Sequence, residues 1–116
     1  MTEETKPTPP DLNEDALRAA LDKAIDYRRR QAAFKKELKE GKHPDIVLTL
    51  AKCLEDDALA RLRVRVFMES LPGIGKVSAR KLMDELKIAD SRRIQGLGRQ
   101  QRADIETRVR LIAGMR

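Results

Sequence analysis

Residues 71–76 read Leu-Pro-Gly-Ile-Gly-Lys, a series that is typical of a turn between two helices that holds a phosphate group. Pro72 presets a tight turn, while Gly73 and Gly75 permit positive φ and the close approach of another backbone. Lys76 then begins a helix, so its ammonium, the unpaired N–H groups and the positive end of the helix dipole converge on one point. Such a point suits a phosphate oxygen and would not distinguish one base from another. The alternative is a turn that only packs two helices together.

Basic residues surround this turn on both sides. They are Arg61, Arg63, Arg65, Arg80 and Lys81. Arg61 and Arg65 are expected to share one face of the preceding helix, since they are four residues apart. A second helix start, flanked by Gly96 and Gly98, follows Arg92 and Arg93. The two starts together predict contacts with neighbouring phosphates along one positive face.

The charge distribution favours a polyanionic partner. The 116-residue chain carries 25 Lys and Arg against 19 Asp and Glu, with a net charge of +6 and a pI near 9.8. Residues 61–116 hold 14 Lys and Arg against 6 Asp and Glu, whereas residues 1–60 hold 11 against 13. The basic half contains the turn, so we expect double-stranded DNA as the partner. Neither a membrane-spanning run nor a signal peptide is apparent, which predicts a cytoplasmic protein without a membrane partner.

Catalysis and metal binding find no support in the sequence. His43 is the only histidine and Cys53 the only cysteine, so both are expected to be structural, and no metal site is predicted. DNA glycosylases use a similar turn with a catalytic lysine, but that position holds Val77 here. We therefore predict no enzyme, no catalytic residues, no cofactor and no small-molecule substrate.

The N-terminal third predicts a tail and one long helix. Residues 1–11 are acidic, polar and Pro-containing, which is typical of disorder. Residues 12–41 show helical spacing of apolar residues, with Asn13 as N-cap and Gly41 as the terminating glycine. The run Arg28-Arg29-Arg30 in this helix is either a solvated face or a second DNA-contacting surface.

Residues 44–113 predict a helical globule, which makes the fold class all-α. Short helices are expected with Pro44 at a first position, from Asp56 or Asp57 to about Ser70, from Lys76, and over residues 99–113. Residues 62–66 also alternate with period two, as a strand would. Asp90 and Ser91 offer an N-cap for a helical turn that holds Arg92 and Arg93. The expected apolar positions include Val77, Ala79, Leu82, Met83, Leu86, Ile105, Val109 and Ile112.

Two motifs, Leu71 to Ala79 and Ser91 to Gly98, together resemble the actinobacterial integration host factor family. A looser likeness extends from about Leu12 to Val109. The resemblance implies a monomeric nucleoid-associated protein with a long N-terminal helix and a helix–two-turns–helix module. It further implies sequence-independent binding of duplex DNA, bending or compaction of that DNA, and in some members assistance to phage integrase.

The resemblance also assigns residues. The phosphate contacts that it implies fall on Gly73, Gly75, Lys76, Arg92 and Arg93. A third arginine usual in the family falls on Gln95, which removes one charge from the second site and bears on both affinity and bending. Ser78 stands where relatives often have a basic residue, although Arg65 and Arg80 are placed to compensate.

Two other binding functions stay open. Ribosomal RNA binding is the closer rival, because a small-subunit ribosomal protein family uses a related module, but its members usually carry a far more basic tail. An adaptor that docks an acidic protein partner on the basic face is the third possibility.

Overall fold

The structure, a computed structural model, describes residues 10–113 and, from residue 13 to residue 112, their side chains. Its regular elements are helices, which confirms the all-α prediction, and one isolated antiparallel bridge joins two of the connecting segments. The expected tail over residues 1–11 lies almost wholly outside this range. Within the range, no helix is both long and apolar enough to cross a membrane.

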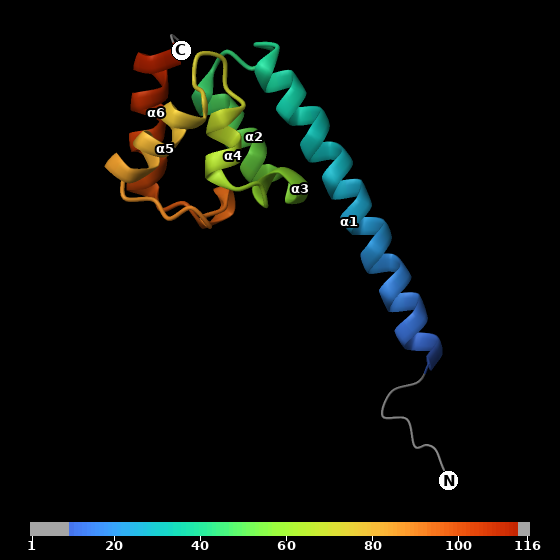
Figure 1. The fold of residues 1–116 in the computed structure, drawn as a ribbon. Coiled ribbons are helices and arrows are strands. Elements are labelled where there is room, and N and C mark those ends of the chain that lie inside the picture. The colour runs from blue at the N-terminus through green and yellow to red at the C-terminus, as the bar shows by residue number, and fades with distance from the viewer. Residues whose placement is uncertain (1–9, 114–116) are drawn as a thin grey trace.

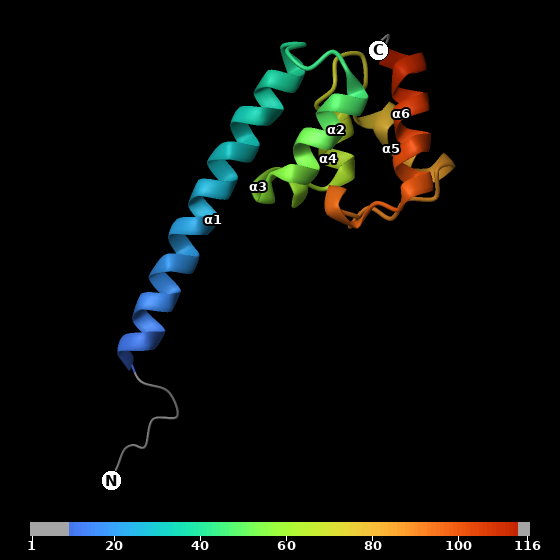
Figure 2. The same ribbon diagram turned by 180° about the vertical axis from the view of Figure 1, so that it is seen from behind.

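Helix α1 spans Pro10–Lys39 and projects from a smaller helical globule (Figure 1). It begins two residues before the predicted boundary. Its C-terminal half docks on the globule through Phe34 and Leu38, which are almost fully buried. Its N-terminal half stands clear of the globule in both views (Figures 1 and 2). After the last turn Gly41 adopts a φ of 75°, the left-handed conformation expected of a terminating glycine.

Polar contacts fix the middle of α1 on the globule. The Arg30 guanidinium donates to the Asp56 carboxylate at 2.5 Å, and the Gln31 side-chain amide donates to the carbonyl of Ala58 at 2.7 Å. Asp56 also caps the next helix by accepting from the backbone N–H groups of Ala58 and Leu59. Burial opposes the ionisation of Asp56, but these amides and Arg30 outweigh it and lower its pKa. A partly buried ionic contact therefore helps to hold α1 on the globule.

The globule packs short helices around an aliphatic core. They are α2 (Ile46–Glu55), α3 (Asp57–Ala60), α4 (Val64–Glu69), α5 (Lys76–Glu85), the 3-10 helix η1 (Ile94–Gly96) and α6 (Arg99–Ala113). Core side chains that are at most 2% exposed include Ile46, Leu50, Phe67, Met68, Leu82, Met83, Ile94, Ile105 and Val109. Residues of α2, near the start of the globule in the sequence, and of α6, at its end, meet in this core. The core therefore holds the helices of the globule together.

The third predicted helix, over residues 56–70, is wrong as one element because it is divided into α3 and α4. In the connection Arg63 is extended and forms the isolated bridge with Arg93. The period-two alternation in the sequence thus reflects a short extended segment. Because this break changes the chain direction, Arg61 and Arg65 do not lie on a common helix, contrary to the prediction.

Other local expectations also need correction. Pro44 does not stand at the first helical position as predicted, because Asp45 acts as the N-cap of α2 and the helix begins at Ile46. Val77 and Ile112 were expected in the core, but their side chains are 83% and 43% exposed. Val77 stands in the first turn of α5, which lies on the surface of the globule. Its exposed side chain is therefore part of the surface beside the turn of residues 71–76.

Candidate nucleic-acid interface

The turn before α5 has the conformation that its sequence requires at one of its two glycines. Gly73 has a φ of 82°, which favours glycine, whereas Gly75 has a φ of −93° and a ψ of −175°, an ordinary extended conformation. The predicted positive φ is therefore correct for Gly73 and wrong for Gly75. Ile74 between them is buried, and its N–H donates to the carbonyl of Leu71 at 3.2 Å. The apolar side chain anchors the turn while the glycines stay on the surface.

The N-terminus of α5 presents donors to solvent. Gly75 is its N-cap and provides no side-chain cap, and a Cβ at Gly75 would find no heavy atom of the protein within 4 Å. Lys76, Val77 and Ser78, which form the first turn, are exposed. The first N–H groups of a helix have no acceptor inside the helix. The first amides of α5 are therefore accessible from solvent.

A groove between α4 and α5 extends from this end of α5. It has a volume of about 400 Å³ and is lined by Arg65, Glu69, Lys76, Val77 and Arg80. The Arg65 guanidinium lies 3.0 Å from the Glu69 carboxylate, so one cation of the groove is neutralised. Lys76 and Arg80 make no ion pair among the described residues. The groove is net basic, with the open end of α5 at its edge.

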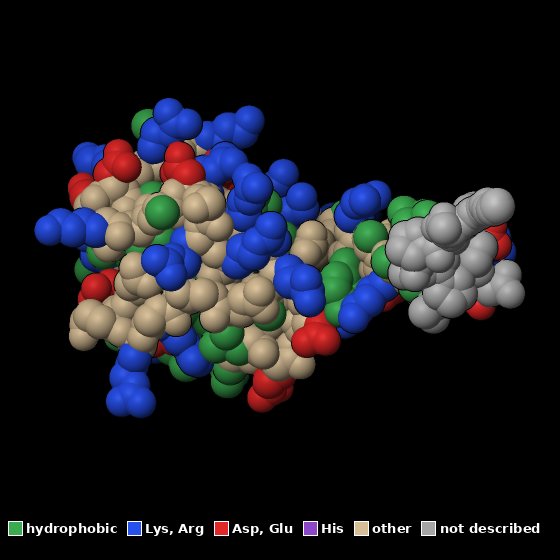
Figure 3. All heavy atoms as spheres, turned by 90° about the horizontal axis from the view of Figure 1, so that it is seen from below, with side chains coloured by type: hydrophobic (Ala, Val, Ile, Leu, Met, Phe, Trp, Pro, Cys, Tyr) green, Lys and Arg blue, Asp and Glu red, His purple; other side chains and the backbone are tan. Residues whose placement is uncertain are grey.

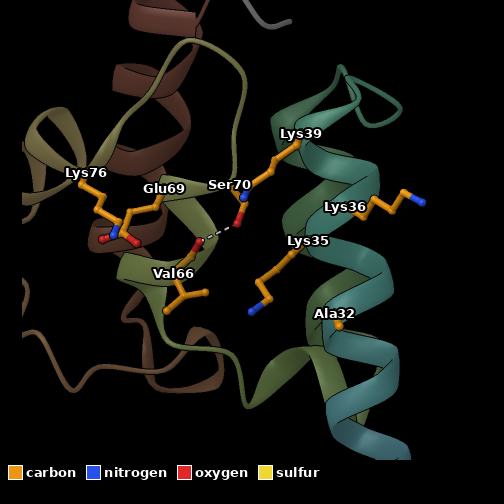
Figure 4. A pocket seen from close by; sticks show the side chains of 8 residues that line it. All are labelled: Ala32, Lys35, Lys36, Lys39, Val66, Glu69, Ser70 and Lys76. Atoms are coloured by element: carbon orange, nitrogen blue, oxygen red, sulfur yellow. Dashed lines mark hydrogen bonds between the residues drawn. The ribbon is translucent and has the colours of Figure 1, made fainter.

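A second groove, between α1 and α4, meets the first at Glu69 and Lys76. It has a volume of about 430 Å³, and the α1 residues Lys35 and Lys39 line its other side (Figure 4). In Figure 4 Lys36 points away from the groove and Lys35 points into it. In the sequence these lysines continue the basic run of Arg28 to Arg30, which leaves open whether they form a solvated face or a second phosphate-contacting surface. Lys35 and Lys39 face Lys76 because of the way α1 docks on the globule. Local sequence patterns do not encode this docking.

The arginines after α5 are brought back to the start of α4. The Val64 N–H donates to the carbonyl of Arg92, and the Ile94 N–H donates to that of Leu62, both at 2.9 Å. Arg92 and Arg93 lie in this extended pairing before η1 begins, so the predicted helical turn that would hold them is wrong. The pairing nevertheless places both of them beside residues 61–63 at the entrance of α4.

Backbone carbonyls hold two of these guanidinium groups. Arg93 donates through Nη1 to the carbonyl of Arg61 at 2.8 Å, and Arg92 donates through Nη1 to the carbonyl of Gly96 at 2.8 Å. A Cβ at Gly96 would lie 3.2 Å from the Arg92 Cδ, so the absence of a side chain there lets Arg92 fold back. Each guanidinium has five N–H donors, so both keep donors for a ligand.

The start of α6 does not repeat the start of α5. The N–H of Gly98 donates to the Gln101 side-chain oxygen at 3.0 Å, so one of the amides at this end already has a side-chain partner. The sequence predicted two similar helix starts. A capping glutamine lies within the helix and can be read from the sequence only after the helix boundary is known.

The arginine run on α1 is divided by its contacts. Arg30 pairs with Asp56 and Asp26, which leaves it as an anchor of the helix rather than a free cation. Arg28 and Arg29 are exposed and have no hydrogen bond or ion pair within the described part of the chain. Two of the three predicted residues of the second surface are therefore available.

Tyr27 links this region of α1 to the arginines of the globule. The Arg61 guanidinium carbon lies 5.4 Å from the centre of the Tyr27 ring, and the Lys23 Nζ lies 5.5 Å from it. Both distances allow a cation–π contact. Figure 3 shows Lys and Arg side chains gathered where α1 meets the globule and continuing along the helix.

The remaining chemically active side chains have structural roles. His43 lies against the Phe34 ring and makes a 2.9 Å contact with the Glu37 carboxylate, which holds the Glu37 pKa below its usual value. Burial raises the pKa of the Cys53 thiol to about 12. Within residues 13–112, no three His, Cys, Asp or Glu side chains are grouped so as to hold a metal ion.

Comparisons with known proteins define the class first. Residues 35–109 match the family model described as the S13-like H2TH domain, the helix–two-turns–helix module. This match covers the globule and the C-terminal end of α1. It begins just where α1 starts to bury apolar residues.

Relatives then define the family. The chain is 40% identical over 93 residues to the integration host factor of Mycobacterium tuberculosis, covering 80% of this chain and 88% of that protein. It is 38% identical over 97 residues to the integration host factor of Streptomyces coelicolor, covering 84% and 90%. A solved structure of sIHF bound to an 8-bp palindromic DNA is 37% identical, has a TM-score of 0.68, and covers 75% of this chain and 97% of that one. The chain belongs to the actinobacterial integration host factor family, which is not a family of enzymes.

Proposed function

We propose that this protein binds the phosphate backbone of double-stranded DNA with little dependence on base sequence, and bends or compacts the duplex within the nucleoid. The observation that carries this proposal is the open N-terminus of α5, where uncapped amides stand beside Lys76 and Arg80. Amides and ammonium groups recognise phosphate and sugar rather than base edges. The sIHF structure, solved with DNA, supports the same partner for this chain.

The residues divide into two groups that hold different phosphates. Gly73, Gly75 and Lys76 hold one phosphate at the start of α5, and Arg92 and Arg93 hold others beside the entrance of α4. Further cations widen the positive face, namely Arg61, Arg63, Arg65, Arg80 and Lys81. The bridge between Arg63 and Arg93 and the groove that contains Arg65 connect the two groups through the first turn of α4. Both groups belong to one globule, so the DNA-binding unit is a single chain.

Bending requires either asymmetric neutralisation of phosphates by the globule or phosphate contacts outside it. Arg28 and Arg29 on α1 supply them, while Arg30 keeps α1 at a fixed angle through its pair with Asp56. A duplex that follows both surfaces is neutralised unevenly and must curve, which costs elastic energy that the added contacts offset. Assistance to phage integrase, as the family resemblance implies, follows from a bent duplex and needs no separate protein-binding surface.

Structured RNA is the second candidate ligand, because the matched domain model is S13-like. A competition assay separates the two ligands. We expect several unrelated DNA duplexes of equal length to displace a labelled duplex equally well, and a folded RNA hairpin of equal charge to displace it less efficiently. If the hairpin displaces the labelled duplex better than any DNA duplex, RNA is the ligand and the proposal fails.

A further inference from the structure

The groove between α1 and α4 contains lysines to which the proposed DNA contacts assign no phosphate. Lys35 and Lys39 line its α1 side and face Lys76 across it, and none of these three lysines makes an ion pair within the described part of the chain. The acid of the groove, Glu69, is already paired with Arg65 at 3.0 Å. The groove therefore carries a positive charge that no described side chain balances.

Lys35 is the lysine of this groove whose charge is least hydrated. Its side chain is partly buried, whereas Lys39 and Lys76 are exposed, and it points into the groove (Figure 4). An ammonium loses hydration as it is buried, and buried charges in proteins are normally paired. The Ser70 hydroxyl in the same groove already donates to the carbonyl of Val66 at 2.9 Å, and neither group is an acid. An anion in the groove would supply the partner that Lys35 lacks.

The lysines of α1 are arranged as a row, which suits a linear polyanion better than a compact one. Lys35 and Lys39 are four residues apart, so they stand about 6 Å apart along the helix axis and about 40° apart around it. Arg28 precedes Lys35 by seven residues and points within about 20° of the same direction. The row therefore leads from the projecting part of α1 into the groove, where Lys76 stands at the opposite wall.

We propose that one strand of the duplex passes the start of α5 and continues along the groove between α1 and α4, where Lys35 and Lys39 each hold a further phosphate. This inference rests on the proposed function, because it adds a segment to the same DNA path. The segment connects the phosphate contacts of the globule with Arg28 and Arg29 of α1. It also neutralises the duplex on the side that faces α1, which favours curvature toward that side.

Protection of lysines from acetylation tests this path directly. The full chain is briefly acetylated with and without a saturating duplex, and the modified lysines are identified by mass spectrometry. Lys36 is the matched control, because it neighbours Lys35 on α1 but points away from the groove. We expect the duplex to protect Lys35 and Lys39 several-fold more than Lys36. Equal protection of Lys35 and Lys36 would overturn the groove path, and so would protection of Lys35 by tripolyphosphate but not by the duplex, since the groove would then hold a small anion.

Single variants separate this inference from the proposed function. Lys35→Ala should lower affinity for a duplex about fivefold, measured by fluorescence anisotropy, whereas Lys36→Ala and Lys35→Arg should stay within twofold of wild type. Thermal unfolding verifies that each variant is folded. If wild-type protein binds the duplex and the duplex protects Lys76, but Lys35→Ala binds as tightly as Lys36→Ala, the groove path is wrong while the proposed function stands. If wild-type protein binds no duplex, both fail.

Discussion

Gly75→Ala isolates the contribution of backbone amides to phosphate binding. The added Cβ meets no protein atom within 4 Å, and a φ of −93° with a ψ of −175° suits any residue. The lost N-cap preference costs a few tenths of a kcal/mol to about 1 kcal/mol, and the reduced entropy of the unfolded chain offsets a similar amount. The free energy of unfolding should therefore change by less than about 1 kcal/mol.

The effect on DNA binding should be much larger. A methyl group at the open end of α5 keeps a phosphate oxygen away from the amides, and a hydrogen bond to a charged group is worth about 1.5–3 kcal/mol. This corresponds to a loss of affinity of about 10- to 150-fold. The salt dependence of binding should not change, because the variant removes no cation. Lys76→Ala, in contrast, should make the slope of log affinity against log salt shallower by about 0.9.

Fluorescence anisotropy with a labelled short duplex measures both quantities, and thermal unfolding verifies the fold. Gly98→Ala is the matched control, because Gly98 precedes α6, its N–H is already taken by Gln101, and a Cβ there meets only the Gln101 oxygen at 3.7 Å. We expect wild-type affinity from this control. A folded Gly75→Ala that binds as wild type would refute phosphate binding at the start of α5, whereas a Gly98→Ala that loses as much affinity would show that the start of α6 also contacts DNA.

Three further variants examine the surrounding structure. Gly96→Ala should keep the fold but push Arg92 off its carbonyl, which lowers affinity several-fold in the anisotropy assay, and a folded variant with wild-type affinity would contradict the role of Gly96. Asp56→Ala should lower the free energy of unfolding in urea by about 1 kcal/mol at pH 7. Because folding lowers the Asp56 pKa, this stability is present above about pH 4 and is lost at lower pH, so the difference from wild type should shrink there; a constant difference would contradict the ionic contact. Replacing Arg28 and Arg29 by Ala should reduce the bend angle in a gel-phasing assay more than affinity, and an unchanged angle would exclude α1 as the second surface.

The sequence predicted the features that local rules determine. A glycine with positive φ at Gly73, a terminating glycine at Gly41 and the long helix before it follow from backbone sterics and side-chain periodicity. These rules act within a few residues of one another. The all-α class and the family motifs were accessible for the same reason.

Long-range contacts account for what the sequence did not predict. The break between α3 and α4 is held by pairing with residues 92–94, about 30 positions further along the chain. The docking of α1 decides that Arg30 is an anchor and that Lys35 faces Lys76 across a groove. Charge runs give no sign of which cations have partners, because the partners come from other helices.

A salt titration of duplex binding tests the central claim most directly. If the globule holds about five phosphates through amides, lysine and arginines, the slope of log affinity against log salt should be about −4 to −5. Duplexes of unrelated sequence should give this same slope and affinities within a few-fold of one another. A slope near zero, or a strong preference for one sequence, would show that bases rather than phosphates are recognised and would contradict the account.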